Sequence, residues 1–152
     1  MKRLRLLLVF AVLCALIGAS APTTASAANA RKGDAMMDAI NWARASAGLR
    51  PLARSRRLVH SSRARASLMM RADFFAHPSY LSVPTFDRVG EVLEIHGGRR
   101  PQTGAVIRRW VNSPGHHAVI ASRAYRWIGA ARAIGRYGGA RATIWVVRFG
   151  KH

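Results

Sequence analysis

Few side chains in this sequence are suited to chemistry: six histidines, one cysteine and only two glutamates. Both glutamates stand in one short segment, Gly-Glu-Val-Leu-Glu-Ile at residues 90–95. His77 precedes Pro78, which disfavours a helical conformation at the histidine, so we expect His77 at the start of a loop, where side chains can face a cleft. A carboxylate and imidazoles brought together from separate segments can transfer protons or bind a metal ion.

The segment that holds the two glutamates predicts a short β-strand, which the following glycine pair ends. Because successive side chains of a strand point to opposite faces, Glu91 shares one face with Leu93, and Glu94 shares the other with His96. An ionised carboxylate on a core-facing side is costly unless a cation or a hydrogen-bond donor meets it. We therefore expect Glu91 to face inward and to pair with Arg88 or an imidazole, whereas Glu94 is predicted to be solvated.

The other histidines differ in how well they are placed for a chemical role. His116 and His117 are neighbours on a predicted short helix, for which Ser113 suits the N-cap position. Adjacent helical residues point about 100° apart, so only one of the two can face a given site. His60 and His152 stand among polar residues or at the end of the sequence, and we expect no chemical role for them. The sequence has no serine-nucleophile, metalloprotease or phosphate-loop motif.

Hydrophobic periodicity predicts the elements that must position these residues. The last strand is apolar on both faces, which requires cover on both faces. The pattern therefore predicts an α+β fold, a three-layer α-β-α sandwich with a central antiparallel sheet. The predicted helices span residues 34–47, 54–73, 101–111 and 116–121, and the predicted strands span residues 90–95, 127–134 and 142–149.

The N-terminal residues have the pattern of a secretory signal peptide. Basic residues precede an apolar run, and a small-residue region ends in Ala-Ser-Ala at position 27. The apolar run is shorter than the roughly 20 residues needed to span a bilayer, so we expect cleavage rather than a permanent anchor. Cys14 lies within the run and would be removed with it.

These features divide the sequence into three parts. We predict a signal peptide at 1–27, a flexible leader at 28–33 and one domain at 34–152. After removal of the signal we expect no transmembrane span and no thiol. The protein is thus expected to be secreted, either free outside the cell or in the cell envelope, and to be a monomer.

The composition is strongly basic, with 25 lysines and arginines against six acidic residues and a formal net charge of +19. Such a charge attracts polyanions. Because no nucleic-acid-binding motif is present and export separates the protein from the chromosome, we expect an anionic envelope polymer or lipid rather than nucleic acid as partner. An arginine-rich surface with no specific partner explains the composition equally well.

Read in order, several segments resemble the CAP superfamily, which includes cysteine-rich secretory proteins, antigen 5 and plant pathogenesis-related proteins, in its small bacterial form. The resemblance covers roughly residues 34–150. Two of the matching segments end the predicted helices: Gly-Leu-Arg-Pro-Leu at 48–52 after the first and Phe-Phe-Ala-His at 74–77 after the second. The others are Gly-Glu-Val-Leu at 90–93, Trp-Val-Asn-Ser-Pro-Gly-His at 110–116 and the final strand at 145–150.

The resemblance implies an α-β-α sandwich with a cleft lined by two histidines and acidic residues, which in some members bind a divalent metal such as zinc. By this resemblance His77, Glu91 and His116 are the cleft residues, and the two histidines are the metal ligands. Ser113 stands where animal members carry a second cleft glutamate. Val92 replaces the usual asparagine, which removes a local hydrogen-bonding side chain.

The sequence is compatible with three functions. The first is a secreted module that binds a ligand or metal at the cleft, with no catalysis established. The second is a metal-assisted hydrolase in which the metal activates water and Glu91 acts as general base. The third is a cationic envelope-binding protein that acts through its surface charge. We favour the first, because a fold supports many functions and no nucleophile motif is present.

Overall fold

The computed structural model describes residues 24–152. None of the helices in this part of the chain is long and apolar enough to cross a membrane. The predicted signal peptide lies largely outside the described residues, so its cleavage stays a prediction. The elements are α1 (Thr24–Ser46), β1 (Ala53–Arg54), α2 (Arg56–Arg71), β2 (Arg88–Gly97), α3 (Thr103–Val111), α4 (Pro114–Ile120), β3 (Trp127–Tyr137) and β4 (Ala140–Lys151).

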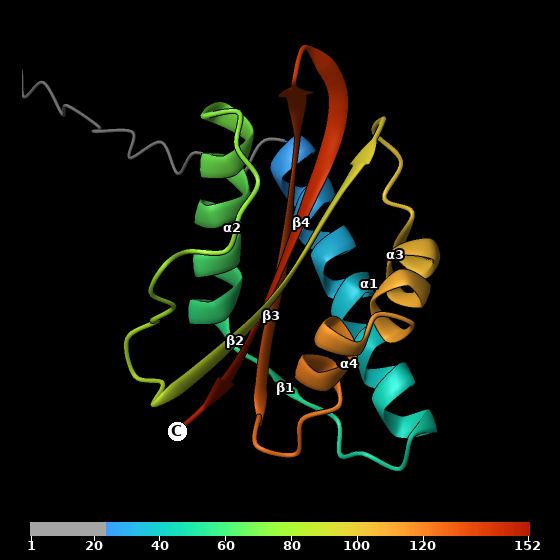
Figure 1. The fold of residues 1–152 in the computed structure, drawn as a ribbon, viewed down its shortest axis with the longest axis vertical. Helices are drawn as coiled ribbons and strands as arrows, with labels where there is room; N and C mark the ends of the chain where they lie inside the picture. Colours follow the sequence, from blue (N-terminus) through green and yellow to red (C-terminus); the bar gives the residue numbers. More distant parts are fainter. Residues whose placement is uncertain (1–23) are drawn as a thin grey trace, which may run out of the picture.

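The four strands form one sheet in the order β1-β3-β4-β2 (Figure 1). β4 pairs antiparallel with both β2 and β3, as predicted. The two-residue strand β1 was not predicted, because Arg54 was assigned to the start of the second helix, and it pairs parallel with β3. Its pairing arises because the extended chain donates hydrogen bonds from Ala53 to Arg126 and from Ser55 to Ile128. β2 is left as an edge strand, which becomes important for the cleft.

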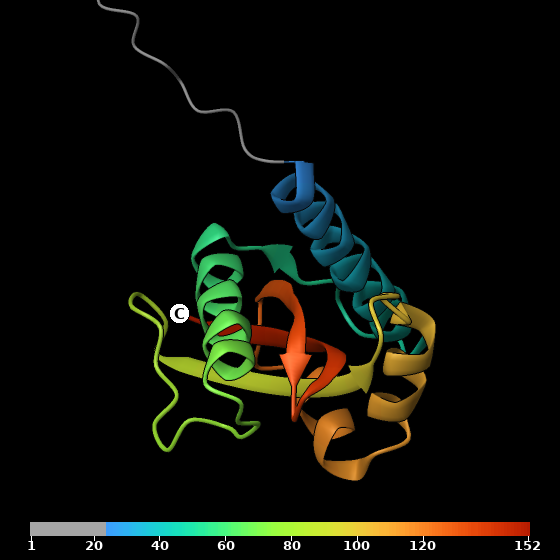
Figure 2. The ribbon, with the colours of Figure 1, turned by 90° about the horizontal axis from the view of Figure 1, so that it is seen from above.

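Helices cover both faces of the sheet, and the predicted three-layer α-β-α sandwich is confirmed (Figures 1 and 2). α2 lies on one face, and α1, α3 and α4 lie on the other. The side chains of β4 divide accordingly. Trp145, Val147 and Phe149 pack into the core beneath α1, α3 and α4, whereas Ile144 and Val146 pack beneath α2.

α2 is close to its predicted extent, and its inner face is the one that the apolar spacing indicates. Ser55 caps the helix by accepting a hydrogen bond from the Leu58 N–H. A Cβ atom at position 129 would lie 2.2 Å from the backbone nitrogen of Val59. Because Gly129 has no side chain, α2 can approach β3 closely. The buried stripe is Leu58, Ser62, Ala66, Met69 and Met70.

α1 begins before the predicted domain boundary and includes residues 28–33, so the leader that we expected to be flexible is helical here. Contacts with β3 explain the difference, since the Arg132 guanidinium donates to the Asn29 side chain at 3.2 Å. Gly33 packs so closely that an added Cβ would lie 2.7 Å from the Ala130 carbonyl oxygen. These partners lie about a hundred residues away in the sequence, where periodicity cannot reveal them.

Candidate ligand-binding cleft

A cleft of about 310 Å3 runs along the free edge of β2. Three segments far apart in the sequence form it: the chain after α2, the middle of β2 and the first turn of α4. The two histidines singled out from the sequence, His77 and His116, both line this cleft. The remaining lining residues are Phe75, Ala76, Leu93, Glu94 and Ile95.

The segment that carries His77 is tied to α2. Arg65 of α2 donates a hydrogen bond to the Ala76 carbonyl at 2.5 Å, and its guanidinium lies 5.2 Å from the centre of the Phe74 ring. The Phe74 N–H donates to the Met69 carbonyl at 3.2 Å. These contacts fix the backbone immediately before the histidine, although the histidine itself is in no regular element.

The imidazole of His77 is oriented by Glu91. Nδ1 of His77 lies 3.0 Å from Oε1 of Glu91, and the His77 side chain is 57% exposed whereas that of Glu91 is 1% exposed. Because an ionised carboxylate only accepts hydrogen bonds, Nδ1 is the protonated nitrogen in this pair and Nε2 remains available to a ligand. Glu91 is not among the cleft-lining residues and reaches the cleft only through His77.

Arg148 holds the other oxygen of Glu91. The two residues are direct neighbours across β2 and β4, and Nε of Arg148 donates to Oε2 of Glu91 at 2.9 Å. Arg148 also donates to the Ser61 hydroxyl of α2. The result is a continuous chain of hydrogen bonds from α2 through Arg148 and Glu91 to His77.

Of the two partners expected for Glu91, the imidazole is confirmed by His77, whereas the pairing with Arg88 is wrong. Arg88 stands three positions earlier on the same strand, and an odd spacing places its side chain on the opposite face. Arg148 was not considered from the sequence, although a signal for it existed. It is the only charged residue between Thr143 and Phe149 in an otherwise apolar strand, and alternation places it on the same face as Val146.

His116 is held by its own helix. Nδ1 of His116 lies 2.9 Å from the Ser113 hydroxyl, and the imidazole ring centre is 6.4 Å from that of Trp110. Ser113 takes the predicted N-cap position without capping the backbone, because its side chain bonds His116 instead. His117 lines a separate hollow of about 80 Å3 beside α1, so only one histidine of the pair faces the cleft.

Arg44 anchors α4 at its other end. This α1 residue is buried, and its guanidinium donates to the carbonyls of Arg50 and Ser122, each at 3.0 Å, and to that of Ile120. Burial, followed by the proximity of other arginines, lowers the pKa of Arg44. The carbonyl of Ile120, the last residue of α4, is thereby satisfied, and the helix that presents His116 is fixed against α1.

Glu94 is not the solvated carboxylate that alternation predicts. It lines the cleft, its Oε1 accepts a hydrogen bond from Nε of Arg109 at 2.7 Å, and Nη2 of the same arginine lies 2.6 Å from this oxygen in an ion pair. The discrepancy has a geometric cause: β2 is an edge strand, so side chains from both of its faces adjoin a cleft that follows the edge. Strand alternation correctly predicts which face of the sheet a side chain occupies, but it does not predict whether that side chain adjoins a cleft at the edge of the sheet.

The described residues supply two imidazole nitrogens for a divalent metal, the Nε2 atoms of His77 and His116. Among residues 24–152, no group of three or more His, Cys, Asp or Glu side chains is arranged to hold a metal ion. Zinc takes three or four protein ligands in most sites, and both oxygens of Glu91 are already engaged. The residues fit a metal only if water or a ligand completes its coordination.

A scan against protein families matches residues 37–149 to the cysteine-rich secretory protein, or CAP, family. The chain belongs to the CAP family. The matched range includes all three residues that the resemblance assigned to the cleft, and it begins within α1 and ends near the end of β4. A search of curated proteins found no match.

Solved structures with the same fold include three bacterial proteins. The CAP domain matches an outer surface protein from Borrelia burgdorferi with a TM-score of 0.65 and 21% identity over 78% of this chain and 91% of that one. It matches an extracellular SCP-domain protein from Bacillus anthracis with a TM-score of 0.62 and 18% identity, covering 80% of this chain and 41% of that one. A cysteine-rich secretory protein from Staphylococcus aureus gives a TM-score of 0.58 and 15% identity over 82% and 39%.

Proposed function

We propose that this CAP-domain protein is a secreted module that binds a ligand or a divalent metal ion in the cleft between His77 and His116. The observation that carries the proposal is the fixed imidazole of His77. A half-exposed histidine is held by a carboxylate that is almost fully buried and is itself held by an arginine. Such support fixes the tautomer and the ring orientation, as it does for metal-binding histidines.

If a metal such as zinc binds, His77 and His116 would hold it through Nε2, and the metal would supply a coordination position for an anionic or neutral ligand. Glu91 would act as a positioning residue rather than as a ligand. Ser113 would have the same role for His116, because its hydroxyl engages Nδ1 of that ring.

The hydrolase alternative is less well supported by the same geometry. A general base needs an oxygen within reach of the water that it activates. Both oxygens of Glu91 accept hydrogen bonds from protein groups, and its side chain is buried below the cleft. Glu94 lines the cleft, but Arg109 binds its carboxylate.

Secretion is part of the proposal. It is supported by the signal-like pattern of the first 27 residues and by the similarity of the fold to an outer surface protein and to an extracellular protein. We expect the secreted protein to be monomeric and to meet anionic polymers or lipids of the envelope. Contacts made through surface charge alone would weaken steeply with salt and would not respond to substitutions in the cleft.

Zinc titration by calorimetry tests the proposal. We expect saturable uptake by the wild-type protein that is lost in His77→Ala and in His116→Ala. His117→Ala is the matched control, because it removes the neighbouring imidazole, which lies outside the cleft, and should leave uptake unchanged. Equal uptake by the wild type and His116→Ala would refute metal binding at the cleft.

Ligand binding without a metal has its own readout. In a nuclear magnetic resonance screen against fragments of bacterial envelope, ligands of the cleft should shift the ring signals of His77 and His116 together. Shifts confined to surface arginines would contradict a cleft ligand and favour the charge-based function.

A further inference from the structure

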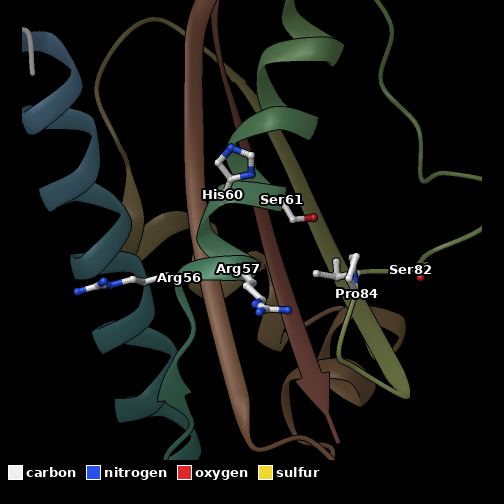
Figure 3. A pocket seen from close by; sticks show the side chains of 7 residues that line it. Arg56, Arg57, His60, Ser61, Ser82 and Pro84 are labelled. Atoms are coloured by element: carbon white, nitrogen blue, oxygen red, sulfur yellow. The ribbon is translucent and has the colours of Figure 1, made fainter.

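A larger hollow, of about 490 Å3, lies between the first half of α2 and the loop that precedes β2. We call it the α2 hollow. Residues Arg56, Arg57, His60 and Ser61 of α2 line one side, and the segment 82–84 lines the other (Figure 3). None of these residues lines the cleft, so the α2 hollow is a separate feature.

The α2 hollow has an unneutralised positive charge. α2 contains no acidic residue, and Arg56 and Arg57 stand at the positive end of its dipole, where cations are unfavourable. Neither arginine forms an ion pair or a side-chain hydrogen bond with any residue in the described range 24–152. Figure 3 shows the side chain of Arg57 directed toward the segment 82–84, whereas Arg56 extends the other way.

Hydrogen-bond donors accompany this charge. The Ser61 hydroxyl points to the same side as Arg57 (Figure 3), and its oxygen accepts a hydrogen bond from Arg148. Its own proton is therefore free to be donated into the α2 hollow. His60 adds an imidazole at the same wall, whereas Ser82 lies at the far end of the opposite segment, beyond Pro84 (Figure 3).

The opposite wall of the α2 hollow is apolar. Val83 is buried and Pro84 presents its ring, and no carboxylate is present among the lining residues. A guanidinium, the Ser61 hydroxyl and an imidazole offer more donors than one carboxylate group readily uses, whereas a phosphate group has three strongly accepting oxygens. The apolar wall suits an organic group attached to that phosphate.

We propose that the α2 hollow binds a phosphate ester, with the phosphate at Arg57 and Ser61 and the carbon portion against Val83 and Pro84. This site goes beyond the cleft and does not depend on the function proposed there. The same phosphate chemistry occurs in soluble esters, in phosphodiester polymers and in lipid headgroups, so the source is decided by experiment.

The test is a titration with glycerol 3-phosphate, followed by the amide signals of Ser61 and Val83 in nuclear magnetic resonance. We expect saturable shifts, weaker binding of inorganic phosphate, and an affinity about tenfold lower in Arg57→Gln, as for loss of one charge-assisted hydrogen bond. Arg71→Gln is the matched control: it removes an exposed cation from the last turn of the same helix and should leave affinity unchanged.

A second variant separates shape from charge. Ser82→Trp fills the hollow and changes no charge, and because Ser82 is exposed the fold should be kept, which a thermal melt verifies. This variant should abolish the shifts. Retained binding in Ser82→Trp, equal weakening by Arg57→Gln and Arg71→Gln, or no saturation with any phosphate would overturn the proposal.

Vesicles of phosphatidylglycerol distinguish the sources. Binding of vesicles that is lost in Ser82→Trp, with soluble glycerol 3-phosphate competing poorly, identifies a lipid headgroup. If glycerol 3-phosphate displaces the protein from the vesicles at an equal concentration of phosphate, the site recognises the phosphate ester without the lipid. That result supports a soluble or polymeric source. Vesicle binding that persists in Ser82→Trp while soluble phosphate causes no shifts contradicts the site.

Discussion

Replacing Arg148 by methionine tests whether the chain of hydrogen bonds from α2 through Arg148 and Glu91 to His77 supports both the fold and the cleft. Methionine keeps much of the length of the side chain and removes the guanidinium. The carboxylate of Glu91, 1% exposed, would lose the buried Arg148 guanidinium and keep, among residues 24–152, the half-exposed His77 as its partner. The substitution thus leaves a buried charge with one partner in place of two.

The expected cost follows from that geometry. Removing one partner of a buried ion pair typically destabilises a protein by about 3 to 5 kcal/mol, because the remaining charge stays buried without compensation. The hydrogen bond to Ser61 is lost as well. We expect a loss near the middle of this range, since His77 can still donate to Glu91.

Urea unfolding of Arg148→Met, Glu91→Gln and the double variant measures the effect. The double variant should lose at least about 2 kcal/mol less than the sum of the single variants, since neither charge is then left unpaired. Arg109→Met is the control. It breaks the Arg109–Glu94 pair, in which the arginine is 46% exposed, and should cost about 1 kcal/mol or less. Additive costs, or a loss below about 1 kcal/mol for Arg148→Met, would refute the reasoning.

Three further outcomes are expected. Arg44→Met should destabilise by about 3 kcal/mol in urea unfolding, because it leaves the buried Ile120 carbonyl and two partly buried carbonyls without this donor, whereas a loss below about 1 kcal/mol would contradict that role. Burial raises the pKa of Tyr125, against an opposing effect of Arg88, so the folded state keeps this proton longer and stability should fall as the pH rises above about 10. Tyr125→Phe should flatten that alkaline decline in melts recorded across the range, and an unchanged slope would count against it. Gly129→Ala should cost more than about 3 kcal/mol, since its Cβ would meet the backbone of α2, while Gly115→Ala, which meets nothing within 4 Å, should be near neutral.

Local patterns predicted most of the fold. The buried stripe of α2 and the two faces of β4 follow from helical and strand periodicity, because an element's own sequence determines which of its faces is apolar. The same reasoning placed Glu91 on the inward face and left only one of His116 and His117 for a site. The start of α1 did not follow, because residues 28–33 are mostly small or polar and are held by contacts with β3.

The partners within the site depended on the tertiary structure. Glu91 and Arg148 are 57 positions apart and meet only because β2 and β4 pair in one register. Glu94 reaches the cleft because β2 is an edge strand, a property of strand order rather than of strand sequence. The α2 hollow likewise exists only because a loop folds back beside α2.

The sequence by itself determined the three-layer fold and the orientation of its apolar faces, since these depend on residue type and on spacing along the chain, and its resemblance to the CAP family indicated the two histidines and the glutamate of the cleft. The tertiary structure decided which charges neutralise one another, which carboxylate adjoins the cleft and where an unpaired arginine borders a hollow. The physical reason is the same in each case: burial and pairing of charge depend on distances between segments, and these distances exist only after the sheet has assembled.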